Sequence, residues 1–308
     1  NFNSYIGKAI TNACDGIFKT NIEDGQNDQS TQNNQVDTML AKGASVVAVS
    51  VCDVTAAPTL IQKCKDAGNV PIIFFNKEIT DYDVINSYEN AYQVTSTGGD
   101  YGASIQAQMV IDYWKEHPEM DKNGDGKLQL VYLMGDPGHT ASQPRCDYLK
   151  STIEDAGIEI DLLAEDTGMW VTATAKEKMD AWVSKYGDEI ECCVAGNDAM
   201  ALGALSAVEA AGFNTDGEES SKYIPIYGID ALPEILSKIE SGEITGSVLQ
   251  DAKTQGQTIV KMAENLTSGK DAVDGIEGVE TEEEAKAVRV PYQAITKDNL
   301  DLAKSTYE

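Results

Sequence analysis

The chain contains 308 residues, enough for two domains of ordinary size that each have their own hydrophobic core. Apolar residues make up 42% and charged residues 24% of the chain, a composition typical of globular rather than disordered proteins. The net charge of −28 argues against nucleic acid and against anionic membrane surfaces as partners. No segment reads as a signal peptide or approaches the length of a transmembrane helix.

The N-terminal part of the chain predicts alternating helices and strands. Val36, Met39 and Leu40 recur at helical spacing, and Gly43 follows them where a helix would end. Apolar runs that are rich in β-branched and aromatic residues predict strands between the helices. We expect helices over residues 1–10, 32–42 and 58–67, strands over residues 45–51 and 70–75, and a flexible stretch over residues 95–99.

The same alternation resumes after residue 100, which predicts a second unit of the same kind. We expect helices over residues 101–116, 143–156, 176–184, 233–241 and 254–266, with another helix capped by Asn197 and Asp198. We expect strands over residues 128–134, 191–195, 224–228, 246–249 and 287–292. Strands that are each followed by a helix form parallel sheets covered by helices. The predicted fold class is therefore α/β, with two doubly wound parallel-sheet lobes.

The six cysteines predict free buried thiols rather than a disulfide framework or a zinc site. None belongs to a C-x-x-C pair, and a domain of this size does not need disulfides. Cys192 and Cys193 lie in an apolar run, where cysteine acts as a small buried side chain. If the protein is extracellular, free thiols indicate an anoxic habitat.

Polar residues stand where several of the predicted strands end. Asn76, Asp136, Asn197 and Asp230 occupy these positions, and open parallel sheets bind ligands at the carboxyl ends of their strands. Each residue also has a purely structural interpretation, because Asn and Asp commonly start loops or cap helices.

Three further side chains could line a cleft. His139 is one of only two histidines, and Arg145 and Trp170 follow it in the same half of the chain. A lone histidine is more often structural than catalytic, and an arginine can pair with any nearby acid. Trp170 lies in a loop-like segment, where an aromatic ring suits either the face of a sugar or the edge of a core.

One stretch has the spacing of an EF-hand calcium loop. Side-chain oxygens stand at positions one, three, five and nine, glycine at six, and position seven would contribute its backbone carbonyl. These positions are occupied by Asp121, Asn123, Asp125, Gln129, Gly126 and Lys127, respectively. Position twelve, normally a bidentate glutamate, is Tyr132 in a predicted strand, so another carboxylate must come from elsewhere in the chain. The alternative is a solvated turn that mimics this spacing.

Eight motifs in chain order resemble the periplasmic galactose/glucose-binding protein family of ABC sugar transport. They occupy residues 26–30, 74–78, 138–139, 166–170, 178–182, 196–200, 228–234 and 288–292. The family has the periplasmic binding protein type I fold, with two lobes, and a calcium loop of the same spacing. By this resemblance, Glu191 supplies the carboxylate that the loop lacks, and Ca²⁺ is the expected cofactor.

The resemblance also implies a sugar site between the lobes. Phe2 and Trp170 would enclose a pyranose ring between their faces. Polar side chains would hydrogen-bond its hydroxyls, which would give orientation and specificity. The implied polar residues are Asn76, His139, Arg145, Asn197, Asp230 and Gln250.

Three departures from the family pattern bear on the site. Ala141 stands where the family has aspartate, which removes an acceptor near the anomeric oxygen and a partner of Arg145. Gln250 replaces an asparagine, giving a longer reach with the same chemistry. The family's first strand would precede Asn1, so we expect the sequence to continue upstream.

We place the lobes at residues 1–95 with 251–286 and at residues 96–250 with 287–308, the latter carrying the calcium loop. Crossings near Ser96, Gln250 and Val290 would form a three-strand hinge whose closure buries the sugar. The predicted function is capture of a hexose, glucose or galactose or a glycoside of them, and its delivery to an ABC transporter permease.

We expect an extracytoplasmic, monomeric protein whose only membrane attachment would be an upstream lipid anchor. The alternative is the ligand-sensing domain of a sugar chemoreceptor or regulator. A regulator would need a basic helix-turn-helix module, which neither the N-terminus nor the charge supplies. An enzyme is not expected, because the chain has no G-x-S-x-G motif and His139 has no obvious nucleophile partner.

Overall fold

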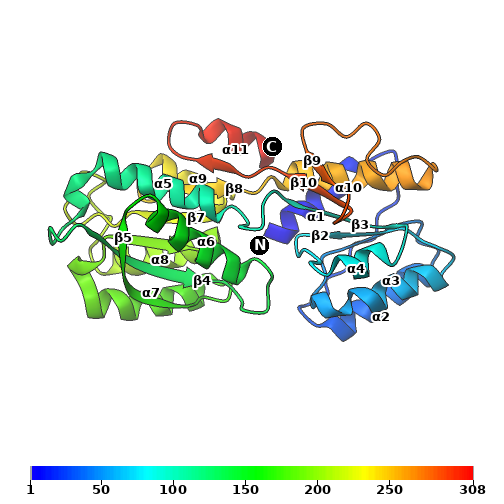
Figure 1. Ribbon diagram of the computed structural model, residues 1–308, viewed down its shortest axis with the longest axis horizontal. Helices are drawn as coiled ribbons and strands as arrows, with labels where there is room; N and C mark the ends of the chain where they lie inside the picture. Colours follow the sequence, from blue (N-terminus) through cyan, green and yellow to red (C-terminus); the bar gives the residue numbers. More distant parts are fainter. Residues whose placement is uncertain (1, 308) are drawn as a thin grey trace. The chain divides into compact units, whose positions relative to one another are not determined.

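The computed structural model describes residues 2–307, and the chain divides into two compact units (Figure 1). The first unit contains residues 1–97 and 251–291, and the second contains residues 98–250 and 292–308. The chain therefore passes between the units three times, after Thr97, Gln250 and Pro291. The boundary that we expected at Lys286 lies at Pro291, because the strand over residues 287–290 pairs within the first sheet.

The first unit is built on a five-stranded sheet of order β1-β2-β3-β10-β9, in which only β9 is antiparallel to its neighbour. Its strands are β1 (Val47–Val49), β2 (Ile72–Phe75), β3 (Ala91–Ser96), β9 (Glu280–Glu282) and β10 (Ala287–Val290). Its helices are α1 (Phe2–Ala13), α2 (Gln29–Ala41), η1 (Val54–Ala56), α3 (Ala57–Asp66), α4 (Tyr82–Asn86) and α10 (Ala252–Thr267).

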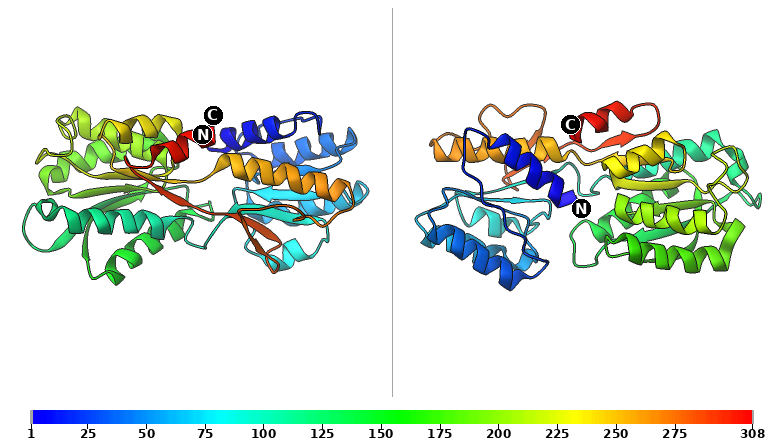
Figure 2. Two further views of the ribbon diagram at one scale, coloured as in Figure 1. Left: turned by 90° about the horizontal axis from the view of Figure 1, so that it is seen from above. Right: turned by 180° about the vertical axis from the view of Figure 1, so that it is seen from behind.

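Two helical layers cover this first sheet. Side chains of α2, α3 and α4 form one core with β1 and β2. Helices α1 and α10 pack side by side, and α10 contacts β3 and β10 (Figure 2). Gly256 permits the close approach of α1, since a Cβ atom there would lie 2.5 Å from the Cβ of Ala9. The predicted doubly wound arrangement is confirmed for this unit.

The second unit is built on a six-stranded sheet of order β11-β8-β7-β6-β4-β5, parallel except for β11. Its strands are β4 (Lys127–Met134), β5 (Glu159–Thr167), β6 (Cys192–Ala195), β7 (Ile226–Asp230), β8 (Gly246–Leu249) and β11 (Gln293–Ile295). Its helices are α5 (Ala103–Glu116), η2 (Pro118–Met120), α6 (Ser142–Asp155), α7 (Thr172–Tyr186), η3 (Gly187–Glu189), α8 (Asp198–Ala210), α9 (Pro233–Glu240) and α11 (Leu300–Tyr307).

The strands of the second sheet contribute alternate side chains to two cores. Leu128, Leu130 and Tyr132 of β4 pack with α5 and α6, whereas Val131 and Leu133 pack with α7, α8 and α9. This alternation follows from the two-residue period of a strand, and both faces are apolar because helices cover both. The central parallel strands therefore end together at one edge of the sheet.

Several elements differ from the sequence expectation. The stretch expected to be flexible from Thr95 begins inside β3, which was missed, as were α4, β5, β9 and α11. The strand expected over residues 287–292 is β10, which ends at Val290, and the missed β11 that follows it belongs to the other sheet. The edge strand β5 is largely exposed and alternates weakly, so its sequence lacks the pattern of a buried strand.

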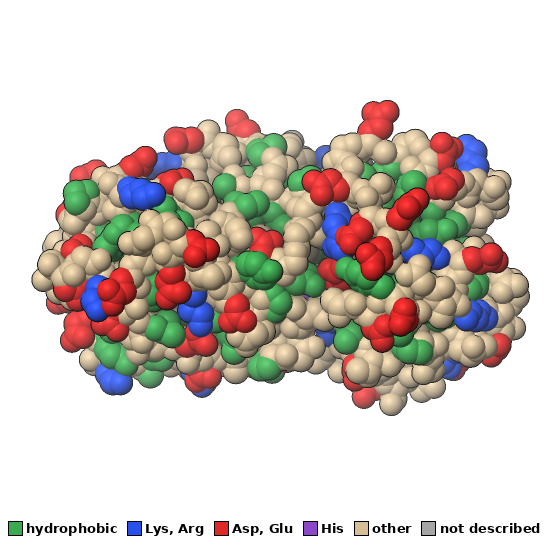
Figure 3. All heavy atoms as spheres, viewed as in Figure 1, with side chains coloured by type: hydrophobic (Ala, Val, Ile, Leu, Met, Phe, Trp, Pro, Cys, Tyr) green, Lys and Arg blue, Asp and Glu red, His purple; other side chains and the backbone are tan. Residues whose placement is uncertain are grey.

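The surface and the cysteines agree with the composition. Acidic side chains outnumber basic ones on the face shown in Figure 3. All six cysteines are free, five of them are buried, and Cys52 is half-buried, so the predicted free thiols are confirmed. Within residues 2–307, no helix has both the length and the apolar character needed to cross a bilayer.

Candidate functional site

The carboxyl edge of the second sheet gathers six of the predicted sugar-binding residues. His139 and Arg145 follow β4, Trp170 follows β5, and Asn197 follows β6. Asp230 is the last residue of β7, and Gln250 comes directly after β8. The five parallel strands are neighbours, so their ends place these side chains along one edge. Asp136, also predicted here, serves its own turn by accepting a hydrogen bond from the Gly138 N–H at 2.9 Å.

The Trp170 ring lies against two glycines at the ends of β4 and β6. A Cβ atom on Gly135 would lie 2.0 Å from the ring, and one on Gly196 would lie 3.2 Å from it. Met169 and Trp170 both adopt left-handed backbone conformations, which turn the half-buried ring over the strand ends. The indole Nε1 is buried and has no hydrogen-bond partner in the described part of the chain. The two glycines therefore fix the position of the ring, and the indole N–H can donate a hydrogen bond to another molecule.

His139 stands beside the Trp170 ring, and a hydrogen bond to its Nδ1 selects the tautomer of the neutral imidazole. The two rings meet edge to face, with centroids 5.4 Å apart. The Ala141 N–H donates to Nδ1 of His139 at 3.1 Å, so in the neutral imidazole Nε2 carries the proton. His139 is thus oriented to act as a hydrogen-bond donor through Nε2.

Arg145 is buried and held by neutral oxygens. Its guanidinium donates to the carbonyls of Tyr101 and Gly196 at 3.0 and 2.7 Å. It also donates to Gln250 Oε1 at 3.2 Å and to the Tyr292 hydroxyl at 3.3 Å. Burial disfavours the charge, but the field of Tyr292 and Asp230 raises the pKa of Arg145, so it stays protonated.

These contacts show how the site accommodates Ala141. The predicted loss of one Arg145 partner is offset by Gln250, whose longer side chain reaches the guanidinium. Thr140 and Ser142 flank Ala141, and each has a buried hydroxyl oxygen without a hydrogen-bond partner among residues 2–307. Buried polar atoms are normally paired, so this segment retains unused hydrogen-bonding capacity.

Asn197 and Asp198 have separate tasks. Asn197 caps α8, because its Oδ1 accepts from the Met200 N–H at 3.0 Å, and its amide nitrogen remains at the sheet edge. Asp198 is fully buried and turns toward β7 and β8, where it accepts hydrogen bonds from Leu232 N and Ser247 Oγ. The cap interpretation is therefore correct for Asn197, but it does not describe Asp198.

Asp230 is a buried carboxylate with an unusual environment. Only 4% of the residue is exposed, and its backbone carbonyl accepts from the Tyr307 hydroxyl at 3.0 Å. Burial and the neighbouring Asp198 carboxylate raise the pKa of Asp230 well above its usual value, while Arg145 acts in the opposite direction. A buried carboxyl group in this setting is stabilised when a ligand forms a hydrogen bond with it.

Two predicted contacts, Phe2 and Asn76, belong to the first unit. Phe2 begins α1 and is buried, and Asn76 follows β2 in a left-handed conformation. The Asn76 side chain donates to Asn3 Oδ1 at 2.9 Å, which joins the loop after β2 to the start of α1. The structure thus brings these two elements together inside the first unit, and their contact with a sugar stays a prediction.

The calcium-like loop folds around its own oxygens. Asp121 accepts from the Asp125 and Gly126 N–H groups at 3.0 and 2.9 Å. Asn123 Oδ1 accepts from Asp125 N at 2.9 Å, and Asp125 accepts from Lys127 N at 2.8 Å. Gly124 and Gly126 both have positive φ angles, as the tight turn requires.

Glu191, directly before β6, contacts this loop, and its role as a metal ligand stays a prediction. Its carboxylate accepts from Lys122 N at 2.7 Å and from Gln129 N at 3.0 Å. Burial and the nearby Asp121 raise the pKa of Glu191. Gln129 Oε1 is buried and has no hydrogen-bond partner in the described chain, while its Nε2 donates to Asp125. Within residues 2–307, no group of three or more His, Cys, Asp or Glu side chains is placed so that it could hold a metal ion.

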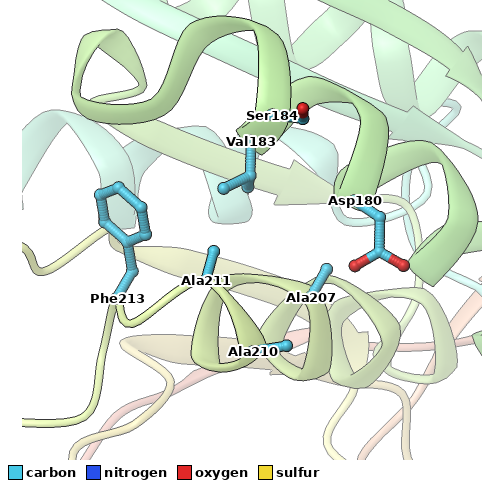
Figure 4. A pocket seen from close by; sticks show the side chains of 7 residues that line it. All are labelled: Asp180, Val183, Ser184, Ala207, Ala210, Ala211 and Phe213. Carbon is cyan, nitrogen blue, oxygen red and sulfur yellow. The ribbon is translucent and has the colours of Figure 1, made fainter.

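A surface pocket of about 340 Å³ lies away from this edge, between α7 and the C-terminal half of α8 (Figure 4). Three alanines, Val183 and Phe213 give it an apolar lining, and Asp180 and Ser184 stand at its side. Helix α8 starts at the sheet edge and runs about 20 Å from it, so this pocket is separate from the predicted sugar residues.

Sequence reasoning missed four residues that support the site. Gly135 makes room for Trp170, Ser247 bonds Asp198, and Tyr101 and Tyr292 hold Arg145. Gly135 carried one available signal, since a glycine directly after a buried strand often marks close approach of another group. The others act through tertiary contacts that no local pattern records.

Comparison with known proteins identifies the family. Residues 1–271 match the family described as periplasmic binding protein domain. The chain is 42% identical over 303 residues to the D-galactose/methyl-galactoside binding periplasmic protein MglB of Haemophilus influenzae, covering 97% of this chain and 87% of that protein. A putative rhizopine-binding protein of Rhizobium meliloti is 29% identical over 306 residues, covering 97% of this chain and 88% of the relative.

A solved structure has the same fold. The ABC transporter solute binding protein of Bacillus halodurans, with bound myo-inositol, superposes with a TM-score of 0.80 at 27% identity. The superposition covers 99% of this chain and 94% of that one. These proteins are extracytoplasmic binding proteins, which confirms the predicted fold, the predicted location and the expectation of a binding protein rather than an enzyme. The chain belongs to the periplasmic binding protein domain family.

Proposed function

We propose that the chain captures a hexose in its pyranose form, galactose or glucose or a glycoside of them, for an ABC transporter. The observation that carries this proposal is hydrogen-bonding capacity at one sheet edge that the described residues do not use. The Trp170 indole N–H is a buried donor without a hydrogen-bond partner among residues 2–307, and the Asp230 carboxyl group is buried at the same edge. A sugar supplies an apolar ring face for the indole and hydroxyls for both groups.

The rest of the edge suits the same ligand. His139 donates through Nε2, Asn197 presents its amide nitrogen, and the Arg145–Gln250 pair adds fixed polar groups. A site that is built to hydrogen-bond hydroxyls rejects a sugar whose hydroxyl is misplaced, because a buried group then stays unpaired. The similarity to a galactose-binding relative at 42% identity supports the hexose class.

Calorimetry with D-galactose, D-glucose, myo-inositol and xylitol tests this proposal. We expect saturable binding of at least one hexose, and Trp170→Ala and Asp230→Ala to weaken that binding. Saturable binding of none of the four compounds, or a preference for xylitol, would contradict the hexose proposal. Transfer to a permease, a monomeric state and an upstream lipid anchor stay predictions.

We further infer that the site tolerates a substituent on the anomeric oxygen. Ala141 replaces a charged acceptor with a methyl group, while the hydroxyls of Thr140 and Ser142 remain to bond the ligand. Loss of the carboxylate should weaken binding of free hexose by about 1–3 kcal/mol, unless these hydroxyls replace it.

The matched variant Ala141→Asp tests the inference about the anomeric substituent. We expect it to bind free galactose more tightly than the unmodified protein does, and methyl galactoside less tightly. Calorimetry with both sugars gives the ratio of their dissociation constants. A strong preference of the unmodified protein for the free sugar would show that the inference is wrong.

We also propose that the loop at residues 121–129 binds Ca²⁺ together with Glu191. The supporting observation is the buried Gln129 Oε1 without a hydrogen-bond partner among residues 2–307, beside Asp121, Asn123 and Asp125. When bound, the ion would supply positive charge to these oxygens. The residues themselves shape the loop and fasten it to the segment before β6 through Glu191.

Thermal unfolding with a chelator, then with added Ca²⁺ or Mg²⁺, tests the metal site. Binding to the native state at 100 times the dissociation constant should stabilise it by about 2.7 kcal/mol. We expect a rise in Tm with Ca²⁺ that Glu191→Gln reduces. Equal Tm values in chelator and in Ca²⁺ would contradict the proposal, and this result would leave the sugar site unaffected.

A further inference from the structure

The turn that presents Asp230 is held in a strained conformation. Asp230 and Ala231 have φ angles of 127° and 52°, so two consecutive non-glycine residues adopt the left-handed region. Each such residue costs about 1–3 kcal/mol and persists only where its surroundings fix it. The strain lies at the strand end where the carboxylate meets its expected ligand.

A buried pair, Asp198 and Ser247, fixes this turn. Asp198 Oδ2 accepts from the Leu232 N–H at 2.7 Å, and Asp198 Oδ1 accepts from Ser247 Oγ at 2.6 Å. Ser247 Oγ in turn accepts from the Ala231 N–H at 3.2 Å. The two N–H groups that follow Asp230 are therefore both bound, one directly and one through the serine. Both Asp198 and Ser247 are fully buried, so neither is exposed to take part in ligand contact itself.

The neighbouring strands are adapted to this pair. Gly228 of β7 leaves space for it, since a Cβ atom there would lie 2.3 Å from Asp198 Oδ1. The Asp230 carbonyl accepts from the Tyr307 hydroxyl at 3.0 Å, which holds the other side of the same residue. The backbone of Asp230 is thereby held in place, and its carboxyl group lies at the carboxyl end of β7.

We propose that Asp198 is a positioning residue for sugar recognition, which acts by holding Asp230 in its strained turn through Ser247 and Leu232. This rests on the proposed function, in which Asp230 accepts a hydroxyl of the sugar. Asp198→Asn keeps the size of the side chain but replaces one acceptor oxygen by an NH₂ group. The Ser247 hydroxyl then loses its acceptor, or Leu232 N–H does, and the turn can relax.

The effect on affinity should be confined to one sugar hydroxyl. We measure galactose and its monodeoxy derivatives by calorimetry with the unmodified protein, Asp230→Ala and Asp198→Asn. Asp230→Ala identifies the hydroxyl that Asp230 contacts. The deoxy sugar that lacks this hydroxyl should bind to the variant and to the unmodified protein with the same affinity. Asp198→Asn should weaken galactose about tenfold or more, but should not weaken that same deoxy sugar. Equal weakening of every sugar by Asp198→Asn would overturn the positioning role.

Two further measurements keep the proposal testable if Asp198→Asn folds poorly or if no hexose binds. Ser247→Ala removes the same support for Ala231 and should give the same selective loss. In crystals of ligand-free Asp198→Asn or Ser247→Ala, residues 230 and 231 should leave the left-handed region. Unchanged φ angles at both positions would overturn the proposal. Absence of hexose binding by the unmodified protein would instead contradict only the proposed function.

Discussion

Replacing Gly135 by alanine should displace the Trp170 ring and weaken sugar binding. The added Cβ would lie 2.0 Å from the ring, and Gly135 does not adopt a positive φ angle, so the backbone accepts alanine. Carbon atoms prefer a separation of about 3.5 Å, so the ring must move by about 1.5 Å, the difference between the two distances. Gly196 lies against the same ring, so the ring must move away from the sheet edge.

The cost follows from the contacts that such a shift disrupts. The edge-to-face contact of Trp170 with His139 is of a kind worth about 0.5–1.5 kcal/mol. The Arg145 guanidinium lies 5.7 Å from the centre of the indole ring, a cation–π contact worth about 0.5–2 kcal/mol. Together these contacts amount to about 1–3.5 kcal/mol, which corresponds to a roughly 5- to 300-fold change in Kd if the sugar needs the original ring position.

Calorimetric titration of D-galactose measures this change, and tryptophan fluorescence reports the altered environment of Trp170. Gly138→Ala is the matched control, because its added Cβ would come no closer than 3.4 Å to any atom, the nearest being in Asp136. We expect Gly138→Ala to bind as the unmodified protein does. An unchanged Kd for Gly135→Ala, with the ring demonstrably moved, would refute the placement of Trp170 in the binding site.

Three further predictions concern stability. In the first unit, Glu78→Gln breaks a buried ion pair with Arg289 and should lower the free energy of unfolding, measured in urea, by about 3–5 kcal/mol. Glu282→Gln, at the exposed side of the same arginine, should lower it clearly less. Burial raises the pKa of Asp198 to about 7, so the native state holds a proton that the unfolded chain releases, and stability should fall as pH rises from about 4 to about 7. The fall could reach roughly 4 kcal/mol and should shrink in Asp198→Asn, so identical pH profiles of Tm would contradict it. Gln129→Leu should abolish the rise in Tm with Ca²⁺, but should change the free energy of unfolding in the presence of chelator by about 1 kcal/mol or less. A rise in Tm with Ca²⁺ that persists in this variant would show that Gln129 is not a metal ligand.

The sequence predicted the buried parallel strands other than β3 because their chemistry is local. Runs such as residues 128–134 and 191–195 are apolar throughout, and the helices between them carry a 3.6-residue period. Polar residues at predicted strand ends, together with those implied by the resemblance, formed the candidate site, and the structure brings those of the second unit to one edge. Strands β5, β9 and β11 lay outside this reasoning, because they are short or exposed edges whose pairing depends on a distant neighbour.

The supports of the site were harder to foresee for the same reason. Gln250 was expected to contact sugar. In the structure its side-chain oxygen accepts a hydrogen bond from Arg145, for which the family pattern predicted a carboxylate at position 141. Asp198 looked like part of a helix cap, and only the fold shows it turned toward the β7 turn. Such roles arise from contacts between residues that are tens of positions apart, which no local spacing encodes.

The hydrogen bond from the Tyr307 hydroxyl to the Asp230 carbonyl has a practical consequence for engineering. Helix α11 reaches back to a strand that precedes it by some 70 residues in sequence. An affinity tag or a fluorescent reporter fused after residue 308, or a protease that trims the last turn, would therefore act on the support of the strand that carries Asp230, a predicted sugar contact.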